Sequence, residues 1–144
     1  MKSTCQEVRP VIGRILLSMI FVMSAVNKVL NWDKTIEKMT SEGMEFVPVL
    51  LLGAIAFEFF GGLSVALGCW ARLGACMLIV FLIPTTLIFH DFWTYEGQQQ
   101  QMQMINFMKN LAILGGLFLV LGRGAGSLSV DARSSKTETS TARH

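Results

Sequence analysis

Four apolar runs, each roughly 20 residues long, decide what this chain can fold into. They are residues 11–30, 46–67, 73–90 and 104–121. A helix of about 20 residues crosses the ~30 Å hydrocarbon core of a bilayer. Charged residues make up only 15% of the chain, whereas a soluble domain carries about 25%. The sequence therefore predicts an all-α integral membrane protein, folded as a four-transmembrane-helix bundle.

The connections between the runs add detail to this prediction. The second and third runs are separated only by residues 68–72, which indicates a tight helical hairpin. Residues 31–39 are typical of a short helix, because Trp32, Ile36 and Met39 fall on one face. We expect this short helix to lie in the outer membrane interface, within the first outer loop.

The distribution of Lys and Arg predicts the orientation in the membrane. One side carries Lys2, Arg9, Arg14, Arg72, Arg123, Arg133, Lys136 and Arg143, and the other carries Lys28, Lys34, Lys38 and Lys109. The side richer in Lys and Arg is normally cytoplasmic. The predicted organisation is a cytoplasmic N-terminus (1–10), a transmembrane domain (11–123) and a flexible cytoplasmic tail (124–144).

The first run has a second interpretation, as a secretory signal. Lys2 and Arg9 precede it, as they would in a signal. However, the run is roughly 20 residues long, and no clear small-x-small cleavage site follows. We expect a retained helix.

Ionisable side chains inside the runs nominate a functional site. A charge at bilayer depth costs roughly 2.5 kcal/mol or more, so such side chains usually face a bundle interior or a wet cavity. Residue counting places Glu58 near the midplane, and Lys28, His90 and Lys109 between the midplane and the outer surface. We predict an outward-opening polar pocket lined by these four. Glu58 and His90 are the candidate catalytic, proton-exchanging residues, and the candidate ligand-binding residues are Arg14, Asn27, Lys28, Lys109, Asn110 and Trp93.

Each of these residues also has a structural interpretation. Arg14 could extend its charged end to the cytoplasmic lipid headgroups, and Lys28 could extend its own to the outer headgroups. Glu58 is too deep for that, and an unpaired carboxylate there would be too costly, so we expect it to pair with Lys109 or Arg14. Asn110 could hydrogen-bond a neighbouring helix, and His90 could be an ordinary helix end.

The sequence contains no haem or metal motif. Cys5, Cys69 and Cys76 form neither a CxxC pair nor a metal-ligand spacing. The only histidines are His90 and His144, so two intramembrane His ligands for haem are absent; Met ligation stays open, although packing explains the methionines more simply. The net charge of +2, without a clustered basic stripe, excludes a nucleic-acid surface.

Several short motifs follow one another along the chain in a characteristic order and spacing. They are Gly13-Arg14, Asn27-Lys28, Glu58-Phe59-Phe60-Gly61-Gly62, Gly68 with Arg72, Phe89-His90-Asp91-Phe92-Trp93, and Phe107-Met108-Lys109-Asn110-Leu111-Ala112 before Gly115-Gly116. This ordered set, from Arg9 to Asp131, resembles the DoxX family of small four-helix membrane proteins. The resemblance implies a multi-pass protein of the inner membrane. Family members have been linked to a thiosulfate:quinone oxidoreductase and to membrane redox or thiol-stress complexes, and the wider group includes cargo receptors and assembly factors.

Two classes of function follow. In the first, the chain is a subunit of a redox complex and binds a quinone or a small sulfur anion. In the second, it is a non-catalytic carrier, binding protein or assembly factor. The sequence does not identify a cofactor, and quinone is the candidate that the first class suggests. The candidate partners are the lipid bilayer, a redox partner subunit and a second copy of the chain, and nucleic acid is not among them.

Overall fold

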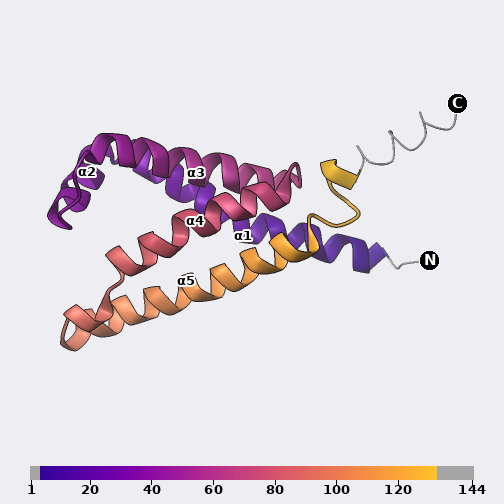
Figure 1. The fold of residues 1–144 in the computed structure, drawn as a ribbon. Coiled ribbons are helices and arrows are strands. Elements are labelled where there is room, and N and C mark those ends of the chain that lie inside the picture. Colours follow the sequence, from indigo (N-terminus) through magenta and orange to yellow (C-terminus); the bar gives the residue numbers. More distant parts are fainter. Residues whose placement is uncertain (1–3, 133–144) are drawn as a thin grey trace, which may run out of the picture.

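The computed structural model describes residues 4–132, and this part of the chain is helical apart from short connections (Figure 1). The elements in chain order are α1 (Thr4–Leu30), α2 (Trp32–Ser41), α3 (Val47–Leu67), α4 (Ala71–Phe89), the 3-10 turn η1 (Phe92–Thr94) and α5 (Gly97–Arg123). Within the described residues, four segments are long and apolar enough to cross a membrane: Glu7–Leu30, Val47–Leu67, Ala71–Thr94 and Gly97–Arg123. The predicted all-α fold with four transmembrane helices is confirmed.

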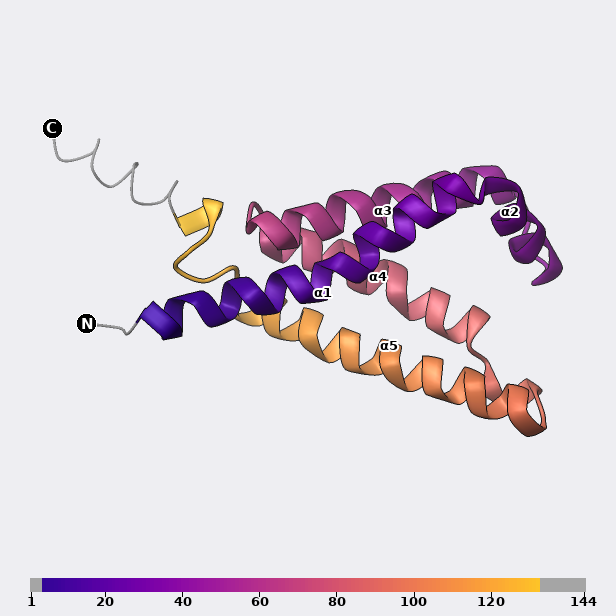
Figure 2. The same ribbon diagram turned by 180° about the vertical axis from the view of Figure 1, so that it is seen from behind.

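The four long helices are not evenly bundled. α1 packs along α3, α3 along α4 and α4 along α5, whereas α1 and α5 touch over only a short stretch. Figures 1 and 2 show that α4 and α5 diverge from α1 and α3 toward the end that carries α2. We call this the α2 end, and the opposite end, where both termini lie, the terminal end.

The half of the bundle nearer the terminal end holds the main hydrophobic core. Its buried members are Phe21, Val65, Ala75, Leu78, Ile79, Leu82 and Leu117. Glycine allows α3 and α4 to approach closely here, because a Cβ on Gly74 would lie 2.6 Å from Ser64 Oγ and 2.9 Å from the carbonyl oxygen of Gly61. Small residues at such crossings let helix backbones pack directly in a membrane.

A second, smaller core fixes α2. Met39 of α2 is buried against Val47 and Leu51 of α3, with Trp32 and Ile36 packed beside it. The apolar face that the sequence predicts for residues 31–39 therefore exists, and it covers the first turns of α3.

The structure adds detail at both ends of the predicted transmembrane domain. α1 begins at Thr4, so residues 4–10 of the predicted N-terminal segment are helical. Residues 124–132, which we expected to be part of a flexible tail, fold back over the terminal end as a C-terminal strap. Asp131 accepts hydrogen bonds from the backbone N–H groups of Trp70 (2.7 Å) and Ala71 (3.2 Å), at the start of α4. The remainder of the predicted tail, 133–144, lies outside the described residues.

The glycine crossing yields a first testable prediction. Gly74→Ala should lower the free energy of unfolding by about 1–3 kcal/mol, because the added methyl group has no room against Ser64 and the Gly61 backbone. Gly115→Ala is the matched control, because a Cβ there meets nothing within 4 Å. Thermal unfolding in detergent measures both, and equal midpoints for the two variants would contradict the crossing.

Candidate functional site

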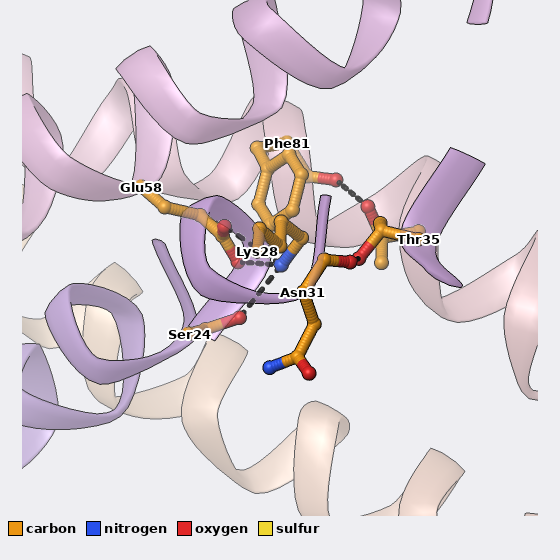
Figure 3. Close-up of polar contacts among 7 residues, drawn as sticks. Ser24, Lys28, Asn31, Thr35, Glu58 and Phe81 are labelled. Carbon is orange, nitrogen blue, oxygen red and sulfur yellow. Dashed lines mark hydrogen bonds and ion pairs between the residues drawn. The ribbon is translucent and has the colours of Figure 1, made fainter. Parts of the chain in front are cut away.

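The centre of the site is an ion pair between α1 and α3. Lys28 Nζ lies 2.9 Å from Glu58 Oε1 and 2.8 Å from Oε2. It also donates to the hydroxyl of Ser24, one turn earlier on α1, at 2.7 Å. The Glu58 side chain is 3% exposed and that of Lys28 is 21% exposed. Figure 3 shows the Lys28 ammonium between the carboxylate and the Ser24 hydroxyl, next to the ring of Phe81, whose centroid is 5.7 Å away.

The packing of the helices explains this pairing. α1 and α3 run in opposite directions, and Gly62 of α3 sits against Phe21 and Val22 of α1. Moving one turn from this contact toward the α2 end brings Glu58 on α3 level with the last turns of α1, where Lys28 lies. The carboxylate and the ammonium therefore meet inside the bundle.

Our prediction of the partner of Glu58 was wrong. We expected Lys109 or Arg14, and the structure pairs Glu58 with Lys28. Lys109 is exposed on α5, in a shallow apolar groove with Met104, Met108 and their neighbours. Its charge faces away from the bundle, so it cannot neutralise Glu58.

A cavity of about 670 Å³ surrounds the ion pair. All five α-helices contribute to its wall, with α2 covering it at the α2 end. Its polar residues are Ser24, Asn27, Lys28, Thr35, Lys38, Glu58, Thr85, His90 and Asn110. The rest of the lining is apolar or glycine, so the cavity suits a largely apolar molecule with a few polar atoms.

The structure brings most of the predicted site residues to this cavity. Lys28, Glu58, His90, Asn27 and Asn110 all line it. His90 Nδ1 is 2.8 Å from Gln103 Oε1, and the Asn110 amide donates to Thr86 Oγ1 at 3.0 Å. The structural interpretation of Asn110, as a hydrogen bond between helices, therefore holds alongside its place in the cavity wall.

Lys109, Trp93 and Arg14 are not part of the cavity wall. Trp93 is exposed on η1 and packs edge-on against Phe92 and Phe107. Arg14 is buried at the terminal end, where Nη1 donates to the carbonyl of Ala125 and Nη2 to that of Leu128 at 3.1 Å. The predicted place of Lys109 in the pocket wall, and of Trp93 near its rim, is therefore corrected, and a ligand-binding role of Arg14 stays a prediction. Arg14 holds the C-terminal strap.

Sequence reasoning missed the contribution of α2 and of the aromatic wall. Lys38 of α2 lies over the ring of Phe89 on α4, 5.3 Å from its centroid, and both residues line the cavity. Phe81 and Thr85 are one turn apart on α4 and also face it. The available signal was the spacing of Phe81, Thr85 and Phe89, four residues apart on one helix face.

Among residues 4–132, no three His, Cys, Asp or Glu side chains gather as metal ligands do. Cys69 and Cys76 are exposed free thiols.

Comparison with known proteins assigns the chain to a family. The DoxX family model matches residues 10–91, which is more than half of the sequence. The chain belongs to the DoxX family. It is 31% identical to the inner membrane protein YphA of Escherichia coli over 87% of its own length and 91% of that protein. It is 32% identical to the inner membrane protein YqjF of the same organism, over 88% of the chain and 92% of the relative.

A second, overlapping similarity reaches outside bacteria. The SURF4 family model matches residues 61–137 of this DoxX-family chain. The ER-derived vesicles protein ERV29 of Saccharomyces cerevisiae is 30% identical over 83% of the chain, which corresponds to 31% of that protein. No solved structure matches the chain significantly.

The ion pair in this DoxX-family protein predicts a specific pattern of stabilities. Lys28→Met or Glu58→Ala should each cost about 3–5 kcal/mol of unfolding free energy, because the remaining charge is stranded in an apolar site. The double variant Lys28→Met with Glu58→Met should be close to the parent, because a buried pair can be replaced by apolar side chains. Lys109→Met is the matched control and should change little. These values come from unfolding in detergent, and a Lys109→Met variant as unstable as Lys28→Met would contradict the pairing.

Proposed function

We propose that this DoxX-family protein is an inner-membrane subunit of a redox complex, of the thiosulfate:quinone oxidoreductase type, that binds a quinone or a small sulfur anion beside Lys28 and Glu58. The observation that carries the proposal is the apolar cavity built around a buried ion pair. An apolar core would hold four helices together without these charges, and ionisable residues inside a membrane usually mark a functional site.

The chemistry of the lining fits a quinone. The volume of about 670 Å³ lies within the range of about 300–1,000 Å³ of small-molecule sites. Lys28 Nζ can donate to a carbonyl oxygen, and the Glu58 carboxylate can accept from the hydroxyl of the reduced form. Phe57 and Phe81 supply aromatic walls. A bound quinone would supply electron acceptance, and the electrons would come from a partner subunit.

Two residues of the cavity are suited to holding protons. Glu58 and His90 both line it, and both can bind or release a proton. In this proposal Glu58 exchanges protons with the headgroup of the quinone, and His90, at the end of α4, exchanges protons with the outer surface. His90 Nδ1 is held by Gln103, which orients the ring.

The orientation that we infer places this cavity in the outer half of the membrane. The Lys and Arg bias supports cytoplasmic termini, so the C-terminal strap would face the cytoplasm and α2 would face outward. The names of the two Escherichia coli relatives support the inner membrane as the location.

The second candidate function is a carrier, binding protein or assembly factor without redox chemistry. The similarity to the SURF4 family and to ERV29 supports this second function, because the name of ERV29 refers to vesicles and not to an oxidoreductase. The cavity would then hold its ligand unchanged. Thiosulfate-dependent quinone reduction by the native complex supports the first function, and partner rescue without redox turnover supports the second.

The binding part of the proposal can be tested directly. The parent, Lys109→Met, and the double variant Lys28→Met with Glu58→Met are purified in mild detergent, and bound quinones and partner proteins are identified by mass spectrometry. Each lost hydrogen bond to a charged group costs about 1.5–3 kcal/mol of binding free energy. The amount of quinone that copurifies with the double variant should therefore be lower than with the parent by a factor of about ten or more. The Lys109→Met variant should match the parent. Equal quinone in the double variant would overturn the site.

A further inference from the structure

We propose that the ligand of the Lys28–Glu58 cavity is a neutral, lipid-soluble amphiphile that enters sideways from the bilayer, through a portal between α3 and α4. This inference rests on the proposed function, because it takes the cavity as the ligand site. It goes further by choosing between the two ligand classes, in favour of a quinone-like molecule over a small sulfur anion.

The portal originates in the way α3 and α4 pack. The two helices are in direct backbone contact at Gly61 and Gly74, and they diverge from there toward the α2 end (Figures 1 and 2). Along the diverging stretch the cavity is lined by Leu50, Gly53 and Phe57 of α3 and by Val80, Pro84 and Ile88 of α4. The cavity therefore extends between the two helices.

The residues of the portal also keep a large accessible surface. The exposed fractions are 48% for Leu50, 37% for Phe57, 58% for Val80 and 38% for Ile88. All four lie in segments that are long and apolar enough to span a membrane, so any surface that they expose outside the cavity would face hydrocarbon. These four side chains are apolar, so an apolar tail could occupy a path between them without leaving the bilayer.

The charge balance at the ion pair disfavours an anion. Lys28 and Glu58 neutralise each other, so an anion at their level would be attracted by one and repelled by the other. It would also lose its hydration in a mostly apolar cavity, which is costly for an uncompensated charge. The other basic groups of the lining, Lys38 and His90, lie at the α2 end, and Lys38 is exposed over the Phe89 ring. A neutral headgroup avoids these penalties and leaves the pair intact.

The hydrogen-bonding capacity of the pair suits oxygen atoms of a neutral headgroup. A carboxylate has about four lone-pair sites. The interactions of the Glu58 carboxylate with Lys28 and Ser24 use only some of these sites. The carboxylate can therefore also accept a hydrogen bond from a ligand hydroxyl. The Asn110 amide uses one N–H on Thr86 and has a second to offer to a carbonyl. The headgroup chemistry is therefore that of carbonyl and hydroxyl oxygens.

Gly53 provides a way to block the portal. A Cβ at Gly53 meets nothing within 4 Å, so a large side chain can be added there without a clash at its base. Gly53→Trp should fill the portal, and Gly53→Leu should fill it in part. Gly115→Trp is the matched control, because Gly115 also has open space around it but does not line the cavity.

The experiment uses the full chain in lipid nanodiscs and two probes, photoreactive decylubiquinone and radiolabelled thiosulfate. We expect saturable decylubiquinone labelling of the parent and of Gly115→Trp. We expect labelling of Gly53→Trp to be weaker or slower by about tenfold or more, an intermediate effect for Gly53→Leu, and no saturable thiosulfate binding. Thermal unfolding of each variant verifies that it is folded, and the Gly53→Leu result decides the matter if Gly53→Trp does not fold.

Three outcomes would overturn the inference in different ways. Decylubiquinone labelling of folded Gly53 variants at the rate and strength of the parent would exclude the portal. Saturable thiosulfate binding by the parent, without decylubiquinone binding, would exclude the neutral ligand but leave the cavity as a ligand site. Binding of neither probe by the parent would remove the proposed function together with the inference.

Discussion

The ion pair between Lys28 and Glu58 is the constraint around which the cavity of this protein is built. Glu58 is buried in the middle of a membrane-spanning helix, where an uncompensated charge is very unfavourable. Lys28 offsets it from the neighbouring helix and so fixes α1 against α3 in both rotation and register. A buried pair of this kind contributes little net stability compared with apolar residues. Its presence is therefore better explained by what it offers to the cavity around it.

The two ends of the bundle are built differently, and the difference limits how a ligand can reach the pair. At the terminal end the helices meet at glycines, and the C-terminal strap is held by Arg14 on one side and Asp131 on the other. At the α2 end the helices diverge around the cavity. The structure therefore places the cavity toward the α2 end and closely packed helices with the strap at the other end. A carrier that delivers its ligand to both sides would need to release the strap, whereas a subunit that exchanges a quinone with the bilayer would not.

The position of a residue along its helix could be predicted from the sequence, but its rotation about the helix axis could not. Each residue adds 1.5 Å along a helix, so residue counting correctly brought Glu58, Lys28 and His90 to one part of the bundle. Lys109 lies on α5 one residue before Asn110, yet Asn110 faces the cavity and Lys109 faces outward. Choosing between them requires knowing which face of α5 meets α4. The role of Arg14 was hidden for another reason. Its partners are backbone carbonyls of Ala125 and Leu128, in a segment whose polar composition indicated a tail.

The contact between Lys28 and Glu58 in a lipid bilayer is the most direct test of this account. Solid-state NMR with ¹⁵N in lysine side chains and ¹³C in glutamate carboxyl groups measures it through the dipolar coupling between the two nuclei. The structure predicts a strong coupling between Lys28 Nζ and Glu58 Cδ, which should disappear in Lys28→Met and persist in Lys109→Met. No coupling for Lys28, or a coupling of Glu58 that depends on Lys109, would contradict the pairing and the cavity chemistry derived from it.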